Sequence, residues 1–507
     1  MLVLAMLLVS FAACGGDPAD TTKPVGTDPA VTDPAESGET GRDAVKDTVP
    51  ADLNFADRDD NTVTFFVRNN VDLFAKEICV EELTNDILYD AIYYRNIDVE
   101  TRLGVKIRQI GQPGSEVNTD WRTWNETLST AVLTNTHDYD AAAIHTYCGS
   151  VLALQNVFAD LTQLQDAETG GYLNLSKPWW HQDSVDALTV YGALFFVGGD
   201  MMITVPARTY AIFFNKELFK EKFPEEDVNS LYQAVKNDTW TISMLSSYVS
   251  QVWDDVNSSG DMDDGDVAGW TYGASPSLSI WAQALGLDFV IKDQYGEMQL
   301  SYIYDPNIIP AFEELTKLYN PEADGVLGGQ KWTQTMMEAG NVLFTYGTLS
   351  AGETWRESSV QYGVLPMPKF NAEQEEYRTS FLGQASALAI CSDITAERTP
   401  IITATCELLC AESYKSVVPA YYGKVLQGLY SKDQPDAEMY DLIVETIVYD
   451  FGMFMFPKTG TVLKSYGGLF GKARTPGYDI AQDIASGTEA WETALEQMMA
   501  SFEAIIE

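Results

Sequence analysis

The chain has 507 residues with 31 basic and 74 acidic side chains, which gives a formal charge of −43 at pH 7. This length predicts two or more domains at roughly 100–200 residues each, and 46% hydrophobic with 12% aromatic residues is typical of a globular chain. The charge excludes proteins that bind nucleic acid or anionic membrane surfaces through clusters of lysine and arginine, and 3 histidines with 6 cysteines disfavour zinc-cluster and haem proteins.

The N-terminus predicts export to the cell surface. Residues 1–13 are an apolar run that ends in small residues directly before Cys14. This run is shorter than the about 20 residues that span a bilayer as a helix, so it is typical of a secretory signal. Small residues, a cysteine and two glycines resemble the lipobox of bacterial lipoproteins, which implies that Cys14 is lipidated. The alternative is a buried N-terminal segment with an ordinary cysteine.

Residues 15–60 are expected to form a disordered acidic tether that follows the signal at 1–14. The segment is built from Asp, Thr, Pro, Gly, Glu and Ala, with TDPAVTDPAESGETG as its clearest stretch. Such a composition buries too little apolar surface to offset the entropy that folding removes. The tether would let a folded domain stand off the extracellular face of the membrane, to which only the lipid binds it.

The first third of the folded part alternates between strands and helices. Residues 63–67 (VTFFV) form an apolar run typical of a buried parallel strand. Similar runs predict strands at 105–110 and 139–144, and apolar residues at intervals of three and four predict helices at 85–104 and 121–135. Strand–helix alternation of this kind predicts a parallel sheet flanked by helices.

Two loops of this predicted sheet are candidates for ligand contact. Ligands of such sheets bind at the carboxyl ends of the strands, and here Asn69 follows the first strand while Tyr147 follows the strand at 139–144. We therefore expect Asn69 and Tyr147 to face a ligand. Arginines that would recognise a charged ligand are few in these loops. Arg68 and Arg208 are the nearby candidates, so the pattern favours a neutral solute.

The remainder of the chain mixes strands with long helices. The segment 188–203 predicts a hairpin, 210–219 predicts a strand that passes into a helix, and 362–366 predicts a strand that leaves its sheet at prolines. From Thr399 onward the pattern is largely helical. Because no internal repeat or second linker separates two halves, the domains are expected to exchange strands.

The order of these segments resembles the extracellular solute-binding proteins of bacterial ABC importers, close to the maltodextrin-binding branch. HDYDAAAIHTY followed by FADLTQL is similar to the strand and lobe crossover of that family, and YAIFFNKELFKEKFPE resembles the strand and helix that open its second lobe. VLFTYGTLSAG, YGVLPMPKFNAEQEEY and GQASALAICSD resemble the stretch that returns to the first lobe. The resemblance covers the chain from about residue 60 to its end.

The resemblance implies an α/β fold of the two-lobed periplasmic-binding-protein kind (type II), with hinge strands that join the lobes. By analogy, the first lobe comprises 61–165 plus 380–430 and the second comprises 166–379 plus 431–507. The family also implies a monomer without catalytic activity, which closes around a solute and delivers it to the permease subunits of an ABC importer.

One loop has the pattern of a calcium site. Residues 255–266 have the sequence DVNSSGDMDDGD. An EF-hand-type loop has oxygen ligands at alternate positions and at its end, with glycine at the sixth position. The ligand set would be Asp255, Asn257, Ser259, Asp261, Asp263 and Asp266. The metal would be structural, as it often is in the resembled family, and no organic cofactor is expected. The alternative is a metal-free acidic loop.

Aromatic side chains are candidates for contact with a sugar, because sugar rings present apolar C–H faces to flat aromatic surfaces. Trp179 and Trp180 stand where the second lobe should begin. Tyr346 occupies the place of a cleft aromatic in the resembled maltodextrin binders. Trp281 and Tyr421 are further candidates. For each of the five, packing in the core is the alternative.

Asp200 is the one acidic candidate for ligand contact. It follows two glycines near the expected hinge and would accept hydrogen bonds from sugar hydroxyls; the alternative is a turn residue. Catalytic motifs do not accompany it, because the sequence has no His-Glu-x-x-His and no Gly-x-Ser-x-Gly. A carboxylate pair spaced for glycoside hydrolysis is inevitable among 74 acids and indicates nothing.

The sequence therefore predicts a lipid-anchored extracellular receptor that binds a carbohydrate, with an oligosaccharide as the favoured solute. A peptide or another polar solute is the alternative within the same class of protein. From other classes, a secreted carbohydrate-active enzyme and an adhesive or structural surface lipoprotein remain as rivals.

Overall fold

The computed structural model describes residues 41–115, 118–273, 278–301, 303–328, 333–355, 360–381, 383–429, 434–455 and 466–506. The chain divides into a unit that ends at Ala44 and a unit from Val45 to Glu507. In the first unit, the described part is a short 3-10 helix, η1 (Gly41–Ala44). Cys14 and the predicted signal lie outside the described residues, so the lipid anchor stays a prediction.

Ordered packing begins before the predicted end of the tether at residue 60. Val49 and Phe55 are buried, and the backbone N–H of Phe55 donates to the carbonyl of Leu103 at 2.7 Å. Asp47 forms an ion pair with Arg102 at 2.8 Å. The expectation of disorder is therefore wrong from Val45 onward, because two apolar side chains and an ion pair attach this segment to the folded unit.

The first lobe is built on a four-stranded sheet in the order β12-β3-β1-β2. Its strands are β1 (Thr62–Arg68), β2 (Lys106–Gln112), β3 (Ala141–His145) and β12 (Ser386–Ile390). β1 pairs in parallel with β2 and β3, and β12 is antiparallel to β3. The three strands predicted in the first third of the chain are confirmed.

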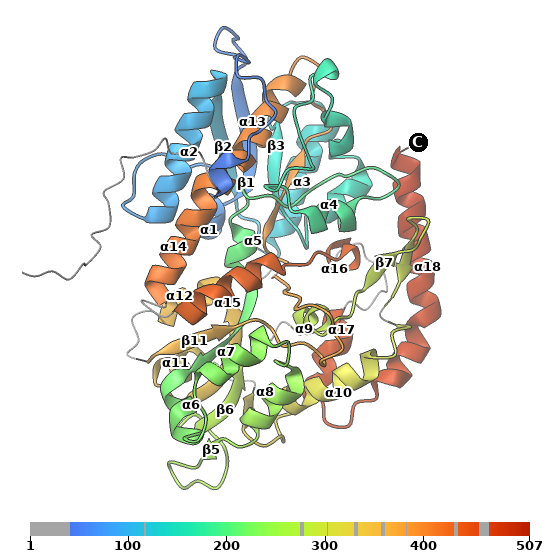
Figure 1. Ribbon diagram of the computed structural model, residues 1–507. Helices are drawn as coiled ribbons and strands as arrows, with labels where there is room; N and C mark the ends of the chain where they lie inside the picture. The colour runs from blue at the N-terminus through green and yellow to red at the C-terminus, as the bar shows by residue number, and fades with distance from the viewer. Residues whose placement is uncertain are drawn as a thin grey trace, which may run out of the picture. The chain divides into compact units, whose positions relative to one another are not determined.

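Helices flank this sheet, as Figure 1 shows. The longest predicted one is confirmed: the carboxylate of Asp86 accepts the backbone N–H of Leu88 at 3.0 Å at the start of α2, and Gly104 ends the helix at φ 66°, a conformation that glycine adopts without strain. The helices of this lobe are α1 (Asp72–Ala75), α2 (Ile87–Leu103), α3 (Asp120–Leu133), α4 (Gln182–Leu188), α5 (Thr204–Ala207) and α13 (Thr399–Glu412), with 3-10 turns η2 (Ser150–Gln155), η3 (Leu161–Leu164) and η4 (Ala167–Thr169).

The second lobe is built on a sheet in the order β11-β4-β10-β6-β5, with β9 paired to β6. Its strands are β4 (Tyr210–Asn215), β5 (Trp253–Asp254), β6 (Val267–Tyr272), β9 (Val326–Gly328), β10 (Val342–Thr348) and β11 (Tyr362–Leu365). β4 lies antiparallel between β10 and β11, while β10 is parallel to β6. The strands predicted to begin at 210 and at 362 are confirmed.

The helices around this second sheet include the one predicted to follow β4. The carboxamide oxygen of Asn215 accepts the backbone N–H groups of Glu217 and Leu218, both at 3.0 Å, and so starts α6. These helices are α6 (Lys216–Lys222), α7 (Asn229–Lys236), α8 (Ile242–Val249), α9 (Ser279–Ala284), α10 (Ile308–Tyr319), α11 (Thr333–Glu338), α12 (Leu349–Trp355), α15 (Gln434–Glu445) and α17 (Tyr466–Leu469), with a 3-10 turn η6 (Phe470–Arg474).

The segment 166–208 belongs to the first lobe, which corrects the expected border at residue 166. Val197 forms a β-bridge with Leu388 of β12, and the backbone N–H of Asn174 donates to Glu407 of α13 at 3.0 Å. The predicted hairpin shortens to one bridge between Val190 and Ala193. The apolar run after it packs on the first sheet instead of pairing with itself, which is why periodicity alone misplaced it.

Three chain segments cross between the lobes next to one another, and we call residues 208–210, 379–385 and 446–450 the crossing segments. Thr209 forms a bridge with Phe381, and Thr379 forms one with Ile447. The backbone N–H of Tyr210 donates to the carbonyl of Ser380 at 3.0 Å. The crossing segments are therefore hydrogen-bonded into a short ladder, the arrangement expected of hinge strands.

Three further helices join the two lobes. α14 (Val418–Leu429) follows a π-helical turn at Ser413–Val417 and contacts both α2 and α12. α16 (Phe451–Met455) follows the third crossing segment. α18 (Ile480–Ile506) runs alongside both lobes in Figure 1 and packs on a hairpin whose strands are β7 (Val290–Lys292) and β8 (Met298–Leu300).

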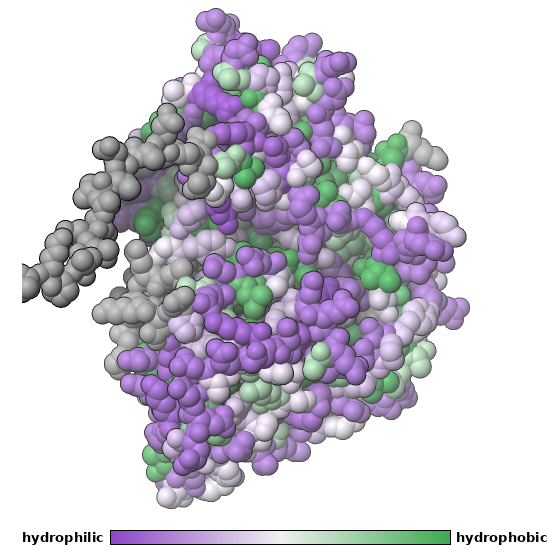
Figure 2. All heavy atoms as spheres, in the orientation of Figure 1, coloured by the Kyte–Doolittle hydropathy of each residue, from purple (hydrophilic) through white to green (hydrophobic). Residues whose placement is uncertain are grey.

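The distribution of hydrophilic and apolar residues is consistent with the acidic, globular composition of the chain. Hydrophilic residues dominate the face shown in Figure 2, as the charge of −43 requires. Within the described part of the chain, no helix is both long and apolar enough to cross a membrane. Cys406 and Cys410 are buried thiols on α13.

Candidate functional site

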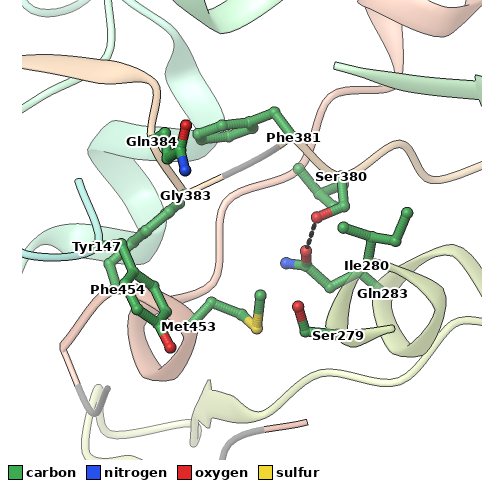
Figure 3. A pocket seen from close by; sticks show the side chains of 11 residues that line it. Tyr147, Ser279, Ile280, Gln283, Ser380, Phe381, Gly383, Gln384, Met453 and Phe454 are labelled. Carbon is green, nitrogen blue, oxygen red and sulfur yellow. Dashed lines mark hydrogen bonds between the residues drawn. The ribbon is translucent and has the colours of Figure 1, made fainter. Parts of the chain in front are cut away.

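A cavity of about 150 Å³ lies where the crossing segments meet the two lobes. Figure 3 shows Tyr147, Met453 and Phe454 on one side of it and Ser279, Gln283 and Ser380 on the other. Its wall comes from a first-lobe loop, helices α9 and α16, and two crossing segments. The lining residues are Tyr147, Ser279, Ile280, Gln283, Ser380, Phe381, Gly383, Gln384, Val448, Met453 and Phe454.

The crossing segment 379–385 shapes this cavity through its backbone. The carbonyl of Gly383 accepts the backbone N–H of Tyr147 at 2.9 Å and the hydroxyl of Thr146 at 2.7 Å. A Cβ at position 383 would lie 2.9 Å from the Cβ of Tyr147, so glycine permits this close approach. The hydroxyl of Ser380 donates to the side-chain oxygen of Gln283, which ties α9 to the hinge. Tyr147, predicted from its place after a strand, thus lies in the cavity wall.

Asp200 lies behind this wall rather than in it. Its carboxylate is 3.3 Å from Nε2 of His181, and Nδ1 of His181 is 2.7 Å from the hydroxyl of Tyr449. The ring of Tyr449 packs edge-on against Phe381, with 4.9 Å between the ring centroids. Asp200 therefore supports the cavity through two intermediate side chains, and the structure does not place it among the lining residues.

A row of aromatic rings lies in the second lobe beside the crossing segments. Tyr346 on β10 stacks between Tyr210 and Trp270, with ring-centroid distances of 5.7 and 5.9 Å and interplanar angles of 22° and 12°. Tyr210 and Trp270 are buried, whereas Tyr346 is partly exposed. We call Tyr210, Tyr346 and Trp270 the aromatic row. Because the backbone of Tyr210 bonds to Ser380, the aromatic row and the cavity border the same crossing segments.

Trp281 supports the aromatic row from inside the lobe. It is fully buried, its indole N–H donates to the hydroxyl of Tyr319 at 2.9 Å, and its ring lies 6.3 Å from that of Tyr346. Its neighbours Ile280 and Gln283 line the cavity instead. The packing alternative therefore holds for Trp281.

Trp179 and Trp180 are core residues of the first lobe, which corrects the expectation that one of them faces a ligand. Both are fully buried, and their indole N–H groups donate to the two carboxylate oxygens of Glu407 at 3.1 and 2.9 Å. Burial raises the pKa of Glu407 to about 7, against the lowering effect of these donors. Side chains sealed in this way contact no ligand in this conformation.

Two other predicted residues also lie away from the cavity wall. Tyr421 is 1% exposed on α14 and packs beside Tyr422, so it too is a core residue here. Asn69 is exposed after the end of β1, where its side chain covers Gly111. Asn69 is therefore not among the residues that line the cavity.

The loop at 255–266 connects β5 to β6 in the second lobe. The carboxylate of Asp255 accepts the backbone N–H groups of Ser259 and Gly260 at 3.0 and 2.9 Å, and Asn257 donates to Asp263 at 2.8 Å. Among the described residues, no three His, Cys, Asp or Glu side chains are grouped as metal ligands. The loop is thus closed by its own hydrogen bonds, and calcium binding by Asp255, Asn257, Ser259, Asp261, Asp263 and Asp266 stays a prediction.

Two arginines meet beside the aromatic row. The guanidinium of Arg68, the last residue of β1, lies 3.9 Å from the ring centroid of Phe74, and that of Arg208 lies 5.4 Å from the same centroid. Arg208 ends α5 at the first crossing segment. Burial lowers the pKa of both arginines, that of Arg68 to about 10. A cluster of positive charge therefore lies at the boundary between the lobes.

Most of the cavity lining was not predicted from the sequence. Residue type gives no indication of ligand contact at Ser380, Gly383 and Gln384. These residues are distinguished by their place on a segment that crosses between the lobes. The available signal was the start of the strand at 386, since the residues before a returning strand must lie at the hinge. Phe454 had no comparable signal, because α16 is a short helix that only the fold brings here.

Comparison with known proteins gives the fold. No protein-family model and no curated protein matches the sequence. Among solved structures, UgpB from Mycobacterium tuberculosis in complex with glycerophosphocholine matches with a TM-score of 0.52 and 14% identity, over 86% of this chain and 99% of that one. A cyclo/maltodextrin-binding protein complexed with maltotetraose matches with a TM-score of 0.49 and 11% identity, over 88% and 97% of the two chains. An ABC substrate-binding protein from Listeria monocytogenes in complex with cycloalternan gives 0.48 and 13%, over 87% and 99%. The two-lobed α/β fold expected from the sequence is confirmed.

Proposed function

We propose that this chain, which has the two-lobed fold of ABC solute-binding proteins, is a receptor that binds a carbohydrate between its lobes. The cavity at the crossing segments carries the proposal, because it takes Tyr147 from the first lobe, Gln283 from the second and Ser380 from the hinge. A solute held there contacts both lobes at once. It therefore stabilises the closed arrangement over an open one by its differential contacts.

The chemistry of the site supports a sugar. Amide and hydroxyl groups line the cavity beside Phe381, Met453 and Phe454, which suits a ligand with both hydroxyl groups and apolar C–H faces. Tyr346, the partly exposed ring of the aromatic row, lies beside the same crossing segments, and an oligosaccharide is favoured on the premise that further sugar units extend from the cavity toward this ring. A peptide or another polar solute is the alternative.

A binding role is favoured over a catalytic one. The described residues that line the cavity include no Asp or Glu, whereas glycoside hydrolysis generally uses a pair of such carboxyl groups beside the scissile bond. A secreted carbohydrate-active enzyme is the rival that turnover assays address.

The remaining expectations belong to the same proposal. The receptor would be a monomer anchored by a lipid on Cys14 at the extracellular face of the membrane, and it would deliver its solute to ABC permease subunits. A calcium ion in the loop at 255–266 would be structural, because that loop lies between β5 and β6, away from the crossing segments.

A thermal-shift screen tests the receptor function. Neutral sugars, oligosaccharides and short peptides are added at millimolar concentration, and a solute that binds the native state raises the melting temperature. Tyr147→Ala should abolish the shift, whereas the matched Tyr295→Ala, at a tyrosine that is 80% exposed on the β7–β8 hairpin, should retain it. Release of product from glycosides, with no stabilisation by any solute, would instead favour the enzyme.

A further inference from the structure

Burial removes much of the water around three arginines of the described chain, Arg95, Arg68 and Arg208. They differ in the protein groups that bond to them in its place. Arg95 is buried and donates to four groups, the side chains of Asn96 and Ser413 and the carbonyls of Glu77 and Ile78. The backbone and side-chain oxygens around it therefore replace the lost water. Arg95 is a satisfied core residue.

Arg68 is also buried, and it has a carboxyl group and a hydroxyl group nearby. Its guanidinium donates to the hydroxyl of Ser386 at 2.8 Å, and the negative charge of Glu77 favours its charged form. The carboxyl of Glu77 in turn accepts hydrogen bonds from Ser386 and, at 2.8 Å, from the hydroxyl of Thr204. Burial raises the pKa of Glu77, which weakens the negative charge available to Arg68.

Arg208 has neither kind of partner. Nε of Arg208 is buried without a hydrogen-bond acceptor, and no described carboxylate forms an ion pair with its guanidinium. Arg68 repels its positive charge, and the neutral phenols of Tyr210 and Tyr421 are the nearby groups that favour its charged form. Its cation–π contact with the ring of Phe74 supplies no hydrogen-bond acceptor to the N–H group at Nε.

An uncompensated, partly buried guanidinium is expensive to maintain in a folded protein. It is even less expected in a chain with 74 acidic side chains, where carboxylates are abundant. Arg208 is also partly exposed and lies two residues before Tyr210, the first ring of the aromatic row. The phenol of Tyr210 is close enough to act electrostatically on this guanidinium, so Arg208 borders the aromatic row.

We propose that the solute carries an oxyanion, either a carboxylate or a phosphate, and that Arg208 binds it, with Arg68 as a second positive charge. This inference rests on the proposed receptor function and names its substrate class: an acidic or phosphorylated carbohydrate. Guanidinium groups bind such oxyanions through paired, charge-assisted hydrogen bonds. The sequence offers only Arg68 and Arg208 near the predicted loops, which favoured a neutral solute. In the folded chain both guanidinium groups lie near the ring of Phe74.

Matched ligand pairs test the proposal by calorimetry and thermal shift. Galactose is compared with galacturonate, a galactose disaccharide with digalacturonate, and glucose with glucose 1-phosphate. The uronate and phosphate arms distinguish the two sources of the oxyanion. We expect one anionic member to bind at least tenfold more tightly than its neutral partner, with an affinity that falls as salt is added.

The variants assign that preference to one side chain. Arg208→Gln should lower the affinity for the anionic ligand by about 10- to 100-fold, the range of a charge-assisted hydrogen bond, and Arg208→Lys should lower it less. Arg108→Gln, at an exposed arginine on the edge strand β2, should leave it unchanged. Without ligand, Arg208→Gln should melt at or above the temperature of the parent, since an arginine with a purely structural role would lower that temperature when removed.

The outcomes separate this inference from the function on which it rests. Tighter binding of the neutral member of every pair overturns the oxyanion proposal and leaves the carbohydrate receptor in place. An anionic ligand whose affinity is the same in Arg208→Gln and in the parent also overturns it. If neutral and anionic carbohydrates alike fail to bind, the proposed function is overturned and this inference with it.

Discussion

The two lobes use aromatic side chains in opposite ways. In the first lobe, Trp179 and Trp180 point inward and share the carboxylate of Glu407. In the second lobe, the aromatic row stacks in order from a crossing segment, and Tyr346 remains partly exposed. An aromatic residue type alone therefore does not distinguish a ring of the core from a partly exposed ring beside the hinge.

The largest expected effect concerns the inward-facing pair. Trp180→Ala should lower the free energy of unfolding by about 3–5 kcal/mol, because it opens a large cavity in a core and removes one hydrogen-bond donor from Glu407. The measurement is urea-induced unfolding followed by circular dichroism. Trp253→Ala is the matched control, since Trp253 is 47% exposed and its loss should change stability by about 0.5 kcal/mol or less. Equal effects would contradict the assignment of Trp180 to the core.

The carboxyl under those tryptophans should make stability depend on pH. The pKa of Glu407 is about 7 in the folded chain, against 4.5 for an ordinary glutamate, so the native state holds a proton that the unfolded chain releases earlier. Its contribution to stability is therefore full below pH 4.5 and falls as the pH rises from 4.5 to about 7. The difference amounts to about 3 kcal/mol.

Two variants distinguish the effect of Glu407 on pH-dependent stability from that of Asp450, a second buried carboxyl group, which lies at the hinge. Burial and the nearby Asp288 raise the pKa of Asp450 to about 7 as well, so its contribution has the same sign. Glu407→Gln and Asp450→Asn should each flatten the decrease in unfolding free energy between pH 5 and pH 8. Because Asp450 precedes α16 while Glu407 lies inside the first lobe, only Asp450→Asn should also alter the pH dependence of solute affinity. A slope that both variants leave intact would refute the prediction.

Tyr346, the one partly exposed ring of the aromatic row, should affect solute affinity. Tyr346→Ala removes a partly exposed ring from the aromatic row, and we expect an affinity for the bound solute about tenfold lower, since aromatic contacts of this kind are worth about 0.5–1.5 kcal/mol beyond area burial. Calorimetry with the best solute from the screen measures it. Tyr94→Ala, at a tyrosine on α2 that is 54% exposed, is the control. A Tyr346→Ala variant that binds like the parent would remove the aromatic row from the site.

The smallest effect is expected at the loop between β5 and β6. If calcium occupies it, millimolar calcium should raise the melting temperature of the parent by a few degrees, through binding to the native state alone, and Asp255→Ala should remove this rise. Solute affinity should stay the same in both, because the loop lies away from the crossing segments. A chelator that changes neither protein would leave the loop as a metal-free turn held by the hydrogen bonds of Asp255.

Local sequence patterns predicted the strands of the first lobe better than they predicted the residues that line the cavity. The apolar runs at 63–67 and 139–144 predicted β1 and β3, because a continuous apolar run suits a strand that is buried on both faces. Gly104 ends α2 through its positive φ. Tyr147 was found by the rule that ligands lie at strand ends. Gln283, Ser380 and Phe454 could not be found in this way, because their positions depend on contacts between segments far apart in the sequence.

The same reasoning explains the errors. The sequence-based prediction places Trp179 and Trp180 at a cleft because it sets a lobe border at residue 166, whereas the border lies at Arg208. Nothing local reveals that Glu407, more than 200 residues later, supplies acceptors for both indoles. Arg208 was recognised as a nearby cation, but its lack of a carboxylate partner is a property of the folded chain and has no counterpart in the sequence.

The C-terminal helix has a consequence for how far the lobes can separate. The ring of Phe502, near the end of α18, stacks against Phe195 of the first lobe at 5.9 Å and lies at the same distance from Phe451 at the end of a crossing segment. α18 also packs on α10 of the second lobe. A wide separation of the lobes would break one of these attachments, so we expect the helix to favour the closed arrangement. Shortening the chain before Phe502 should therefore change solute affinity without altering any residue of the cavity wall.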